Sequence, residues 1–141
     1  MKKFRFGLCV FLILTFTFSS FALASTSVTF TGILLENGVN GKRQTPNITK
    51  GGATGSTGSC NITSLSRTLS KTDCIYATVY RVSNNMAVTG LGTMYEVKNN
   101  TINYNKDSNG NSLGINGVSY IQKMQNTTGM PGVTVSGIFT P

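Results

Sequence analysis

Few residues of this chain are suited to catalysis. It contains no His and no Trp, and the four acids Glu36, Asp73, Glu96 and Asp107 are isolated from one another in sequence. A Ser or Cys nucleophile needs a nearby base, most often His, and a glycosidase needs two carboxylates that the fold brings together. We therefore expect a protein that is not an enzyme, with no catalytic or cofactor-binding residues. The alternative is an unrecognised hydrolase built on Glu96 and a second acid.

The cysteines indicate a structural role. Cys9 lies in the N-terminal segment that we expect to be removed, which leaves Cys60 and Cys74 as an even pair. In an oxidising compartment such a pair predicts a disulfide, which would stabilise the domain by about 3 kcal/mol through loop entropy. The absence of His argues against zinc, and a redox dithiol would have Cys-x-x-Cys spacing. The sequence predicts one disulfide and no metal site.

The beginning of the chain has the layout of a signal peptide. Lys2, Lys3 and Arg5 precede an uncharged apolar run over residues 8–18, too short to span a membrane as a helix. The small residues near Ala24 predict cleavage between Ala24 and Ser25. Residues 25–141 then form a single domain with a net charge of +5, which we expect to be secreted or held at the cell surface, or periplasmic if retained. No second apolar segment follows, so no membrane span is expected.

The basic and aromatic residues allow several kinds of partner. The basic residues are dispersed, which is typical of a solvated surface and leaves an anionic partner surface as the alternative. No basic helix or aromatic platform is recognisable, which argues against nucleic acid. All five tyrosines fall in candidate strands, where core contacts are the default and stacking on sugar rings is the functional alternative. They are Tyr76, Tyr80, Tyr95, Tyr104 and Tyr120.

Short alternating groups of Val, Ile, Thr and Tyr predict a mainly β protein, a small antiparallel β-sandwich or barrel. The clearest candidate strands are Ser27–Leu35, Cys74–Val82, Thr101–Lys106 and Val133–Phe139. The alternation in Cys74–Val82 puts Cys74, Tyr76, Thr78, Tyr80 and Val82 on one face and Ile75, Ala77, Val79 and Arg81 on the other. Both faces are mostly apolar, which indicates a central strand. The first and last of these strands lie near the two ends of the domain, so each could pair with the other or with a neighbouring molecule.

Other segments give weaker signals. The run over residues 42–59 is rich in Gly, Thr and Ser and lacks periodicity, which predicts a flexible loop. Between Ile62 and Leu69 the apolar spacing of three and four residues allows one short helix, and 113–124 fits either a helix or a strand. Asn84-Asn85 and Asp107–Gly110 predict turns.

Two resemblances follow from these features. The alternating stretch Thr26–Ile33 is similar to the strand that opens fimbrial subunits of the chaperone–usher type, which exchange a strand between neighbours. Small basic coat proteins of the dispersin type share the leader, the single bridge and the β-rich character. These features favour a non-enzymatic interaction protein, an adhesin or fimbrial subunit that binds a protein or glycan on a cell surface or associates with itself through edge strands. The alternatives are a toxin-like or inhibitory effector that binds a host or competitor protein, and a basic coat protein on an anionic cell surface.

Overall fold

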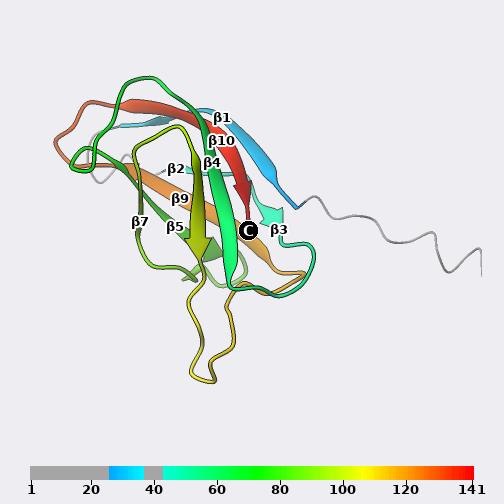
Figure 1. Ribbon diagram of the computed structural model, residues 1–141. Helices are drawn as coiled ribbons and strands as arrows, with labels where there is room; N and C mark the ends of the chain where they lie inside the picture. Colours follow the sequence, from blue (N-terminus) through cyan, green and yellow to red (C-terminus); the bar gives the residue numbers. More distant parts are fainter. Residues whose placement is uncertain (1–25, 37–42) are drawn as a thin grey trace, which may run out of the picture.

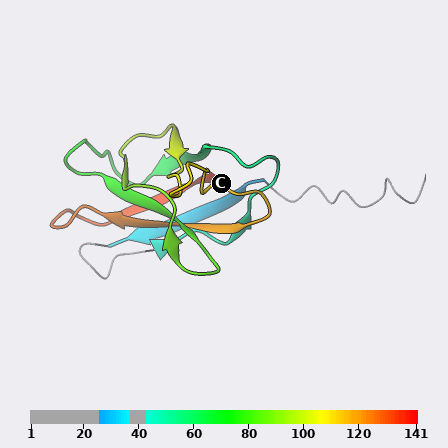
Figure 2. The same ribbon diagram turned by 90° about the horizontal axis from the view of Figure 1, so that it is seen from below.

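The computed structural model describes residues 26–36 and 43–141, which form two antiparallel sheets stacked as a β-sandwich (Figures 1 and 2). The first sheet has the order β1 (Val28–Leu35), β10 (Val133–Thr140), β4 (Thr57–Leu65) and β8 (Asn99–Asn103). The second sheet is centred on β9 (Ser119–Asn126) and β5 (Ile75–Arg81); β2 (Arg43–Gln44) and β3 (Ile48–Thr49) pair with β9, and β6 (Met86–Ala87) and β7 (Gly92–Met94) pair with β5. We call them the first and second sheet.

The predicted leader, residues 1–24, and its cleavage site between Ala24 and Ser25 lie outside the described residues. Within the described ranges, the structure contains no helix with the length and apolar character required to cross a membrane.

The main strand predictions are confirmed. The predicted strands at Ser27–Leu35, Cys74–Val82 and Val133–Phe139 correspond to β1, β5 and β10, and the predicted strand at Thr101–Lys106 overlaps β8. β5 is central, as its two apolar faces predict, because β9 pairs with it on one side and β6 and β7 on the other.

The two terminal strands pair with each other. β1 runs antiparallel to β10, from Val28 opposite Phe139 to Leu35 opposite Val133. The register shifts between Phe30 and Ile33, where Gly32 has a φ of 63°, so a glycine forms the bulge. Since β1 occupies the edge beside β10 in its own sheet (Figure 1), this edge of β10 is closed within one molecule.

The first sheet also depends on a close approach at Gly137 of β10. A methyl group at this position would overlap the carbonyl oxygen of Asn61 in β4 and lie 2.7 Å from the Cζ atom of Phe30 in β1. Only a residue without a side chain allows both neighbouring strands to come this close.

Two of the weaker predictions are corrected. No helix forms at Ile62–Leu69: residues 57–65 form β4, because Ile62 and Cys60 both turn into the core at the two-residue period of a strand. The run over residues 42–59 is not one structureless loop, since it contains β2, β3 and the start of β4. The ambiguous stretch 113–124 contributes most of β9.

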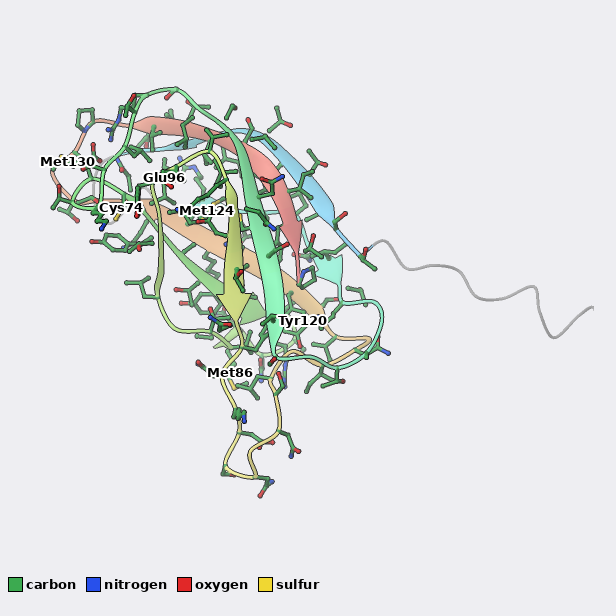
Figure 3. The ribbon with its side chains drawn as sticks, viewed as in Figure 1. Cys74, Met86, Glu96, Tyr120, Met124 and Met130 are labelled. Carbon is green, nitrogen blue, oxygen red and sulfur yellow. The ribbon has the colours of Figure 1, made fainter. Side chains whose placement is uncertain are left out.

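The Cys60–Cys74 disulfide is not formed: both residues are buried free thiols. Cys60 belongs to the first sheet and contacts the side chain of Gln122, which is paired with Val79 in the second sheet. Cys74 precedes Val79 by five residues of extended chain, about 16 Å at 3.3 Å per residue. A disulfide needs Cα atoms within about 7 Å, so the sandwich keeps the thiols apart. Figure 3 shows Cys74 near Met130, at one end of the sandwich.

Candidate functional site

The four acids of the described residues are each engaged separately. Glu36 pairs with Arg43, Asp73 with Arg67, and Glu96 with Lys98. Asp107 accepts hydrogen bonds from the backbone N–H groups of Asn109 and Asn111 in the predicted turn, and these bonds, that of Asn111 foremost, lower the pKa of its carboxyl. No two of these carboxylates face each other across a shared site in these contacts.

Arg67 holds two loops together. Its guanidinium pairs with Asp73 and donates to the carbonyl oxygens of Pro131 at 2.7 Å and Gly132 at 3.3 Å. The hydrogen bond from Arg67 lowers the pKa of the Asp73 carboxyl. This cluster fixes the loop after β4 against the loop before β10, which is a structural role.

The outer face of the second sheet carries an aromatic surface. Because side chains alternate along a strand, Ile75, Ala77 and Val79 of β5 enter the core, and the side chains between them point outward. Those side chains are Tyr76, Thr78 and Tyr80, all half-buried. We call this surface, together with Lys123 and Gln125 of β9 and with Asn85, the tyrosine face.

Lys123 lies at the centre of the tyrosine face. It is directly opposite Thr78 in the pairing of β5 with β9, and its ammonium lies 4.3 Å from the centroid of the Tyr80 ring. The same ammonium donates a hydrogen bond of 2.7 Å to Oδ1 of Asn85. The cation is therefore held over an aromatic ring.

A shallow hollow of about 280 Å³ lies on the tyrosine face. Its lining offers aromatic rings, the Lys123 ammonium and the side-chain amides of Asn85 and Gln125, and it includes no carboxylate. Leu91, 64% exposed, stands at its edge. The hollow therefore combines flat apolar surface, hydrogen-bonding groups and one positive charge.

A second hollow, the side cleft, opens between the two sheets. It has a volume of about 320 Å³ and lies between β8 of the first sheet and the 89–94 segment beside β5 of the second. Leu91 lines this cleft as well, so it separates the two hollows.

Gln122 of β9 lines the side cleft. Gln122 is 2% exposed, and its Oε1 atom has no hydrogen-bond partner in the structure. The rest of the amide contacts the Cys60 thiol. Burial raises the pKa of that thiol to about 12, so it stays protonated and unreactive near neutral pH.

Two further polar residues shape the side cleft. Asn100 of β8 donates through Nδ2 to the carbonyl oxygens of Cys60 at 3.2 Å and Lys98 at 3.0 Å, which leaves its Oδ1 for other partners. The Thr89 hydroxyl accepts from the N–H of Val79 and donates to the carbonyl of Gly90, both at 3.0 Å. Thr89 thus ties the cleft wall to β5.

No family model, no curated protein and no solved structure matches this chain. The similarity to fimbrial subunits and to dispersin-type coat proteins stays a prediction from the sequence.

The sequence indicated part of this arrangement. The alternation in β5 placed Tyr76, Thr78 and Tyr80 on one face, which the structure confirms. It could not place Lys123 beside them, since that contact depends on the register of β9 against β5. Gln122 was missed entirely, because a glutamine in an ambiguous segment carries no sign of burial. Among the described residues, no group of three or more His, Cys, Asp and Glu is placed to bind a metal ion.

Proposed function

We propose that this chain is an exported, non-enzymatic binding module of the adhesin type that recognises glycans at the tyrosine face. The observation that carries the proposal is the outward placement of Tyr76 and Tyr80 on β5, with Lys123 of the neighbouring strand β9 held over the Tyr80 ring. Export rests on the leader predicted from the sequence.

The tyrosine face suits a sugar because it offers both kinds of contact that a sugar ring makes. The C–H face of a sugar ring stacks on an aromatic side chain, and its hydroxyl groups need nearby donors and acceptors. Lys123, Asn85 and Gln125 supply these polar groups around the Tyr rings. The hydrogen bond from Lys123 to Asn85 holds the cation in place before a ligand arrives, which lowers the entropy lost on binding.

The charge of the tyrosine face favours acidic glycans. Lys123 is the charged residue of the hollow, and its lining includes no acid that neutralises it. A carboxylate or sulfate group on a sugar would pair with the ammonium, so binding should weaken as salt is added. An acidic glycan is one form of the anionic cell surface that the sequence analysis gave as an alternative partner.

The contacts of the acidic residues support binding rather than catalysis. Each acid of the described residues is taken up by an ion pair or by a turn, so a general acid and base pair would have to be assembled from engaged groups. The pairing of β1 with β10 supports a module that acts as a single chain. Strand exchange of the fimbrial type would first require β1 to leave its own sheet.

A glycan array tests the proposal. Residues 25–141 are labelled and applied to neutral and acidic glycans at low and moderate salt, beside the variants Lys123→Met and Tyr80→Ala. We expect binding to acidic glycans that falls at least about tenfold in each variant, because each removes one central contact.

The matched control is Lys98→Met. Lys98 also lies over a tyrosine ring, 5.1 Å from the centroid of Tyr95, but away from the tyrosine face. This variant should bind like the unaltered chain. Absence of binding to any glycan, or equal losses in Lys98→Met and Lys123→Met, would contradict the proposal.

A further inference from the structure

We infer that the side cleft is a second, separate binding site, which takes one neutral hydroxyl-rich ring, that is, a single uncharged sugar residue, with Gln122 as its anchor. The inference does not depend on the tyrosine face, because the two hollows open on different sides of Leu91 and share few residues.

The unpartnered Oε1 of Gln122 is the first reason. A polar atom buried without a partner costs folding free energy, about 1–3 kcal/mol, and native proteins keep few of them. Gln122 is 2% exposed and its residue lines the cleft, so the buried atom without a partner belongs to a side chain in the cleft wall rather than on the outer surface. Turning the amide would exchange its oxygen and nitrogen but would still leave one of the two atoms without a partner within the protein.

The available acceptors define what the ligand must supply. Oε1 of Gln122 is free, and the Nδ2 group of Asn100 is already bonded to two carbonyl oxygens, which leaves Oδ1. The Thr89 hydroxyl already donates one hydrogen bond and accepts another within the protein. The cleft thus presents these two acceptors beside the polar side chains of Thr93, Thr101, Asn103 and Asn105. The adjacent hydroxyl groups of a sugar both donate and accept hydrogen bonds, so they suit such a lining.

The size and walls of the cleft favour a single uncharged ring. Its volume of about 320 Å³ is at the lower end of the range of small-molecule sites. Apolar side chains form part of the walls beside the polar ones, namely Ala77, Val79, Leu91, Met94 and Ile102. The lining contains no charged side chain, so an anionic or cationic group would lose its hydration there without gaining a partner.

The cleft is built before a ligand arrives. Its 88–90 wall is fixed to β5 by the hydrogen bond from the N–H of Val88 to the carbonyl of Val79. On the other side, Thr89 forms a bridge with Tyr104, and the N–H of Asn105 donates to the carbonyl of Val88. These bonds join the second sheet to the chain that follows β8, so the opening between the sheets keeps its width.

A titration of ¹⁵N-labelled residues 25–141 followed by NMR tests the inference. The probes are glucose, galactose, mannose and N-acetylglucosamine, with their methyl glycosides to distinguish a free sugar from the linked end of a glycan. N-acetylneuraminic acid serves as the charged comparison, and acetamide as the amide comparison. We expect at least one neutral sugar to bind with a Kd of about 1 mM or lower and to shift the side-chain amide of Gln122 and the backbone amides of Gly90 and Gly92.

The variant Gln122→Met separates function from folding. Methionine fills a similar volume without polar atoms, so the Tm should stay unchanged or rise while the Kd increases at least about tenfold. Gln44→Met is the control: Gln44 is exposed on β2 of the same sheet and lines neither hollow. It should leave the Kd unchanged.

Four results would overturn the inference. They are no shifts in the cleft with any neutral sugar, tighter binding of the charged or amide comparison, unchanged affinity in Gln122→Met, and shifts confined to the tyrosine face. The last result would support the proposed function while removing this second site, so the two proposals can fail separately.

Discussion

Two tyrosines in contact provide a matched test of the core. The rings of Tyr104 and Tyr120 lie with centroids 5.7 Å apart, and both residues are buried, 6% and 0% exposed. The hydroxyl of Tyr120 donates to the carbonyl of Leu113 at 2.7 Å and accepts from the N–H of Ile115 at 2.8 Å. The hydroxyl of Tyr104 has no hydrogen-bond partner in the structure.

Removing the two hydroxyl groups should therefore have opposite consequences. Tyr120→Phe leaves a carbonyl and an N–H without their partner, which should lower the free energy of unfolding by about 1–3 kcal/mol. For a domain of this size, about 1 kcal/mol corresponds to a fall in Tm of about 4 °C. Tyr104→Phe removes an unsatisfied buried hydroxyl, so its stability should be unchanged or higher.

Urea unfolding of residues 25–141 and of both variants, followed by circular dichroism, measures this difference. The m-values should agree, so that the midpoints report stability alone. If Tyr104→Phe lost as much stability as Tyr120→Phe, the hydrogen bonds assigned to Tyr120 would not explain its contribution.

Three further predictions concern Gly137 and the thiols. Gly137→Ala should lower the free energy of unfolding in urea by about 1–3 kcal/mol, because the new methyl group meets Asn61 and Phe30. Gly90→Ala is the control and should change little, since nothing lies within 4 Å of the added methyl group. Equal effects of the two substitutions would refute the close approach. Ellman's reagent should detect no thiol in native residues 25–141 at pH 8 and two thiols after unfolding, because Cys60 and Cys74 are buried and free. If no thiol were detected after unfolding, the two cysteines would form a disulfide. Burial raises the Cys60 pKa from 9.0 to about 12, so the thiol is protonated in both the folded and the unfolded protein below pH 9. Between pH 9 and about 12 only the unfolded protein loses this proton, so the free energy of unfolding should fall by on the order of 1 kcal/mol per pH unit. Urea midpoints measured from pH 8 to 11 should fall less in Cys60→Ala, and equal slopes would contradict the assignment.

Regular alternation made the long strands predictable from the sequence. β1, β5 and β10 have two-residue periods of Val, Ile, Phe and Tyr, and the two faces of β5 were assigned correctly. β2 and β3 are two residues long, so no period exists to be read. Their place is set by pairing with β9, a contact between segments distant in sequence.

The disulfide prediction shows the limit of reasoning from spacing and compartment alone. An even number of cysteines and export favour a bridge, but the two residues enter different sheets, and the distance along β5 separates them. The helix prediction at 62–69 failed for a related reason. Apolar residues spaced by three and four also occur where a strand ends and a loop begins, as they do after Leu65.

The candidate sites were predictable only in part. The alternation of one strand predicts that Tyr76 and Tyr80 share a face, but not that this face points outward: core contacts were the default prediction, and the structure leaves both residues half-buried on the outer face. Lys123 joins them through strand register, and the side cleft depends on how the edges of two sheets meet, which a single sequence does not specify. The unpartnered atom of Gln122 is visible only once its neighbours are placed.

The central claim is that this protein acts by binding a ligand on one face of the sandwich, not through a reactive group. An NMR titration of residues 25–141 with the acidic glycan that binds best tests this claim most directly. The account predicts saturable shifts centred on Thr78, Tyr80 and Lys123 that weaken as salt is added. Shifts elsewhere only, or chemical conversion of the glycan during the titration, would contradict it.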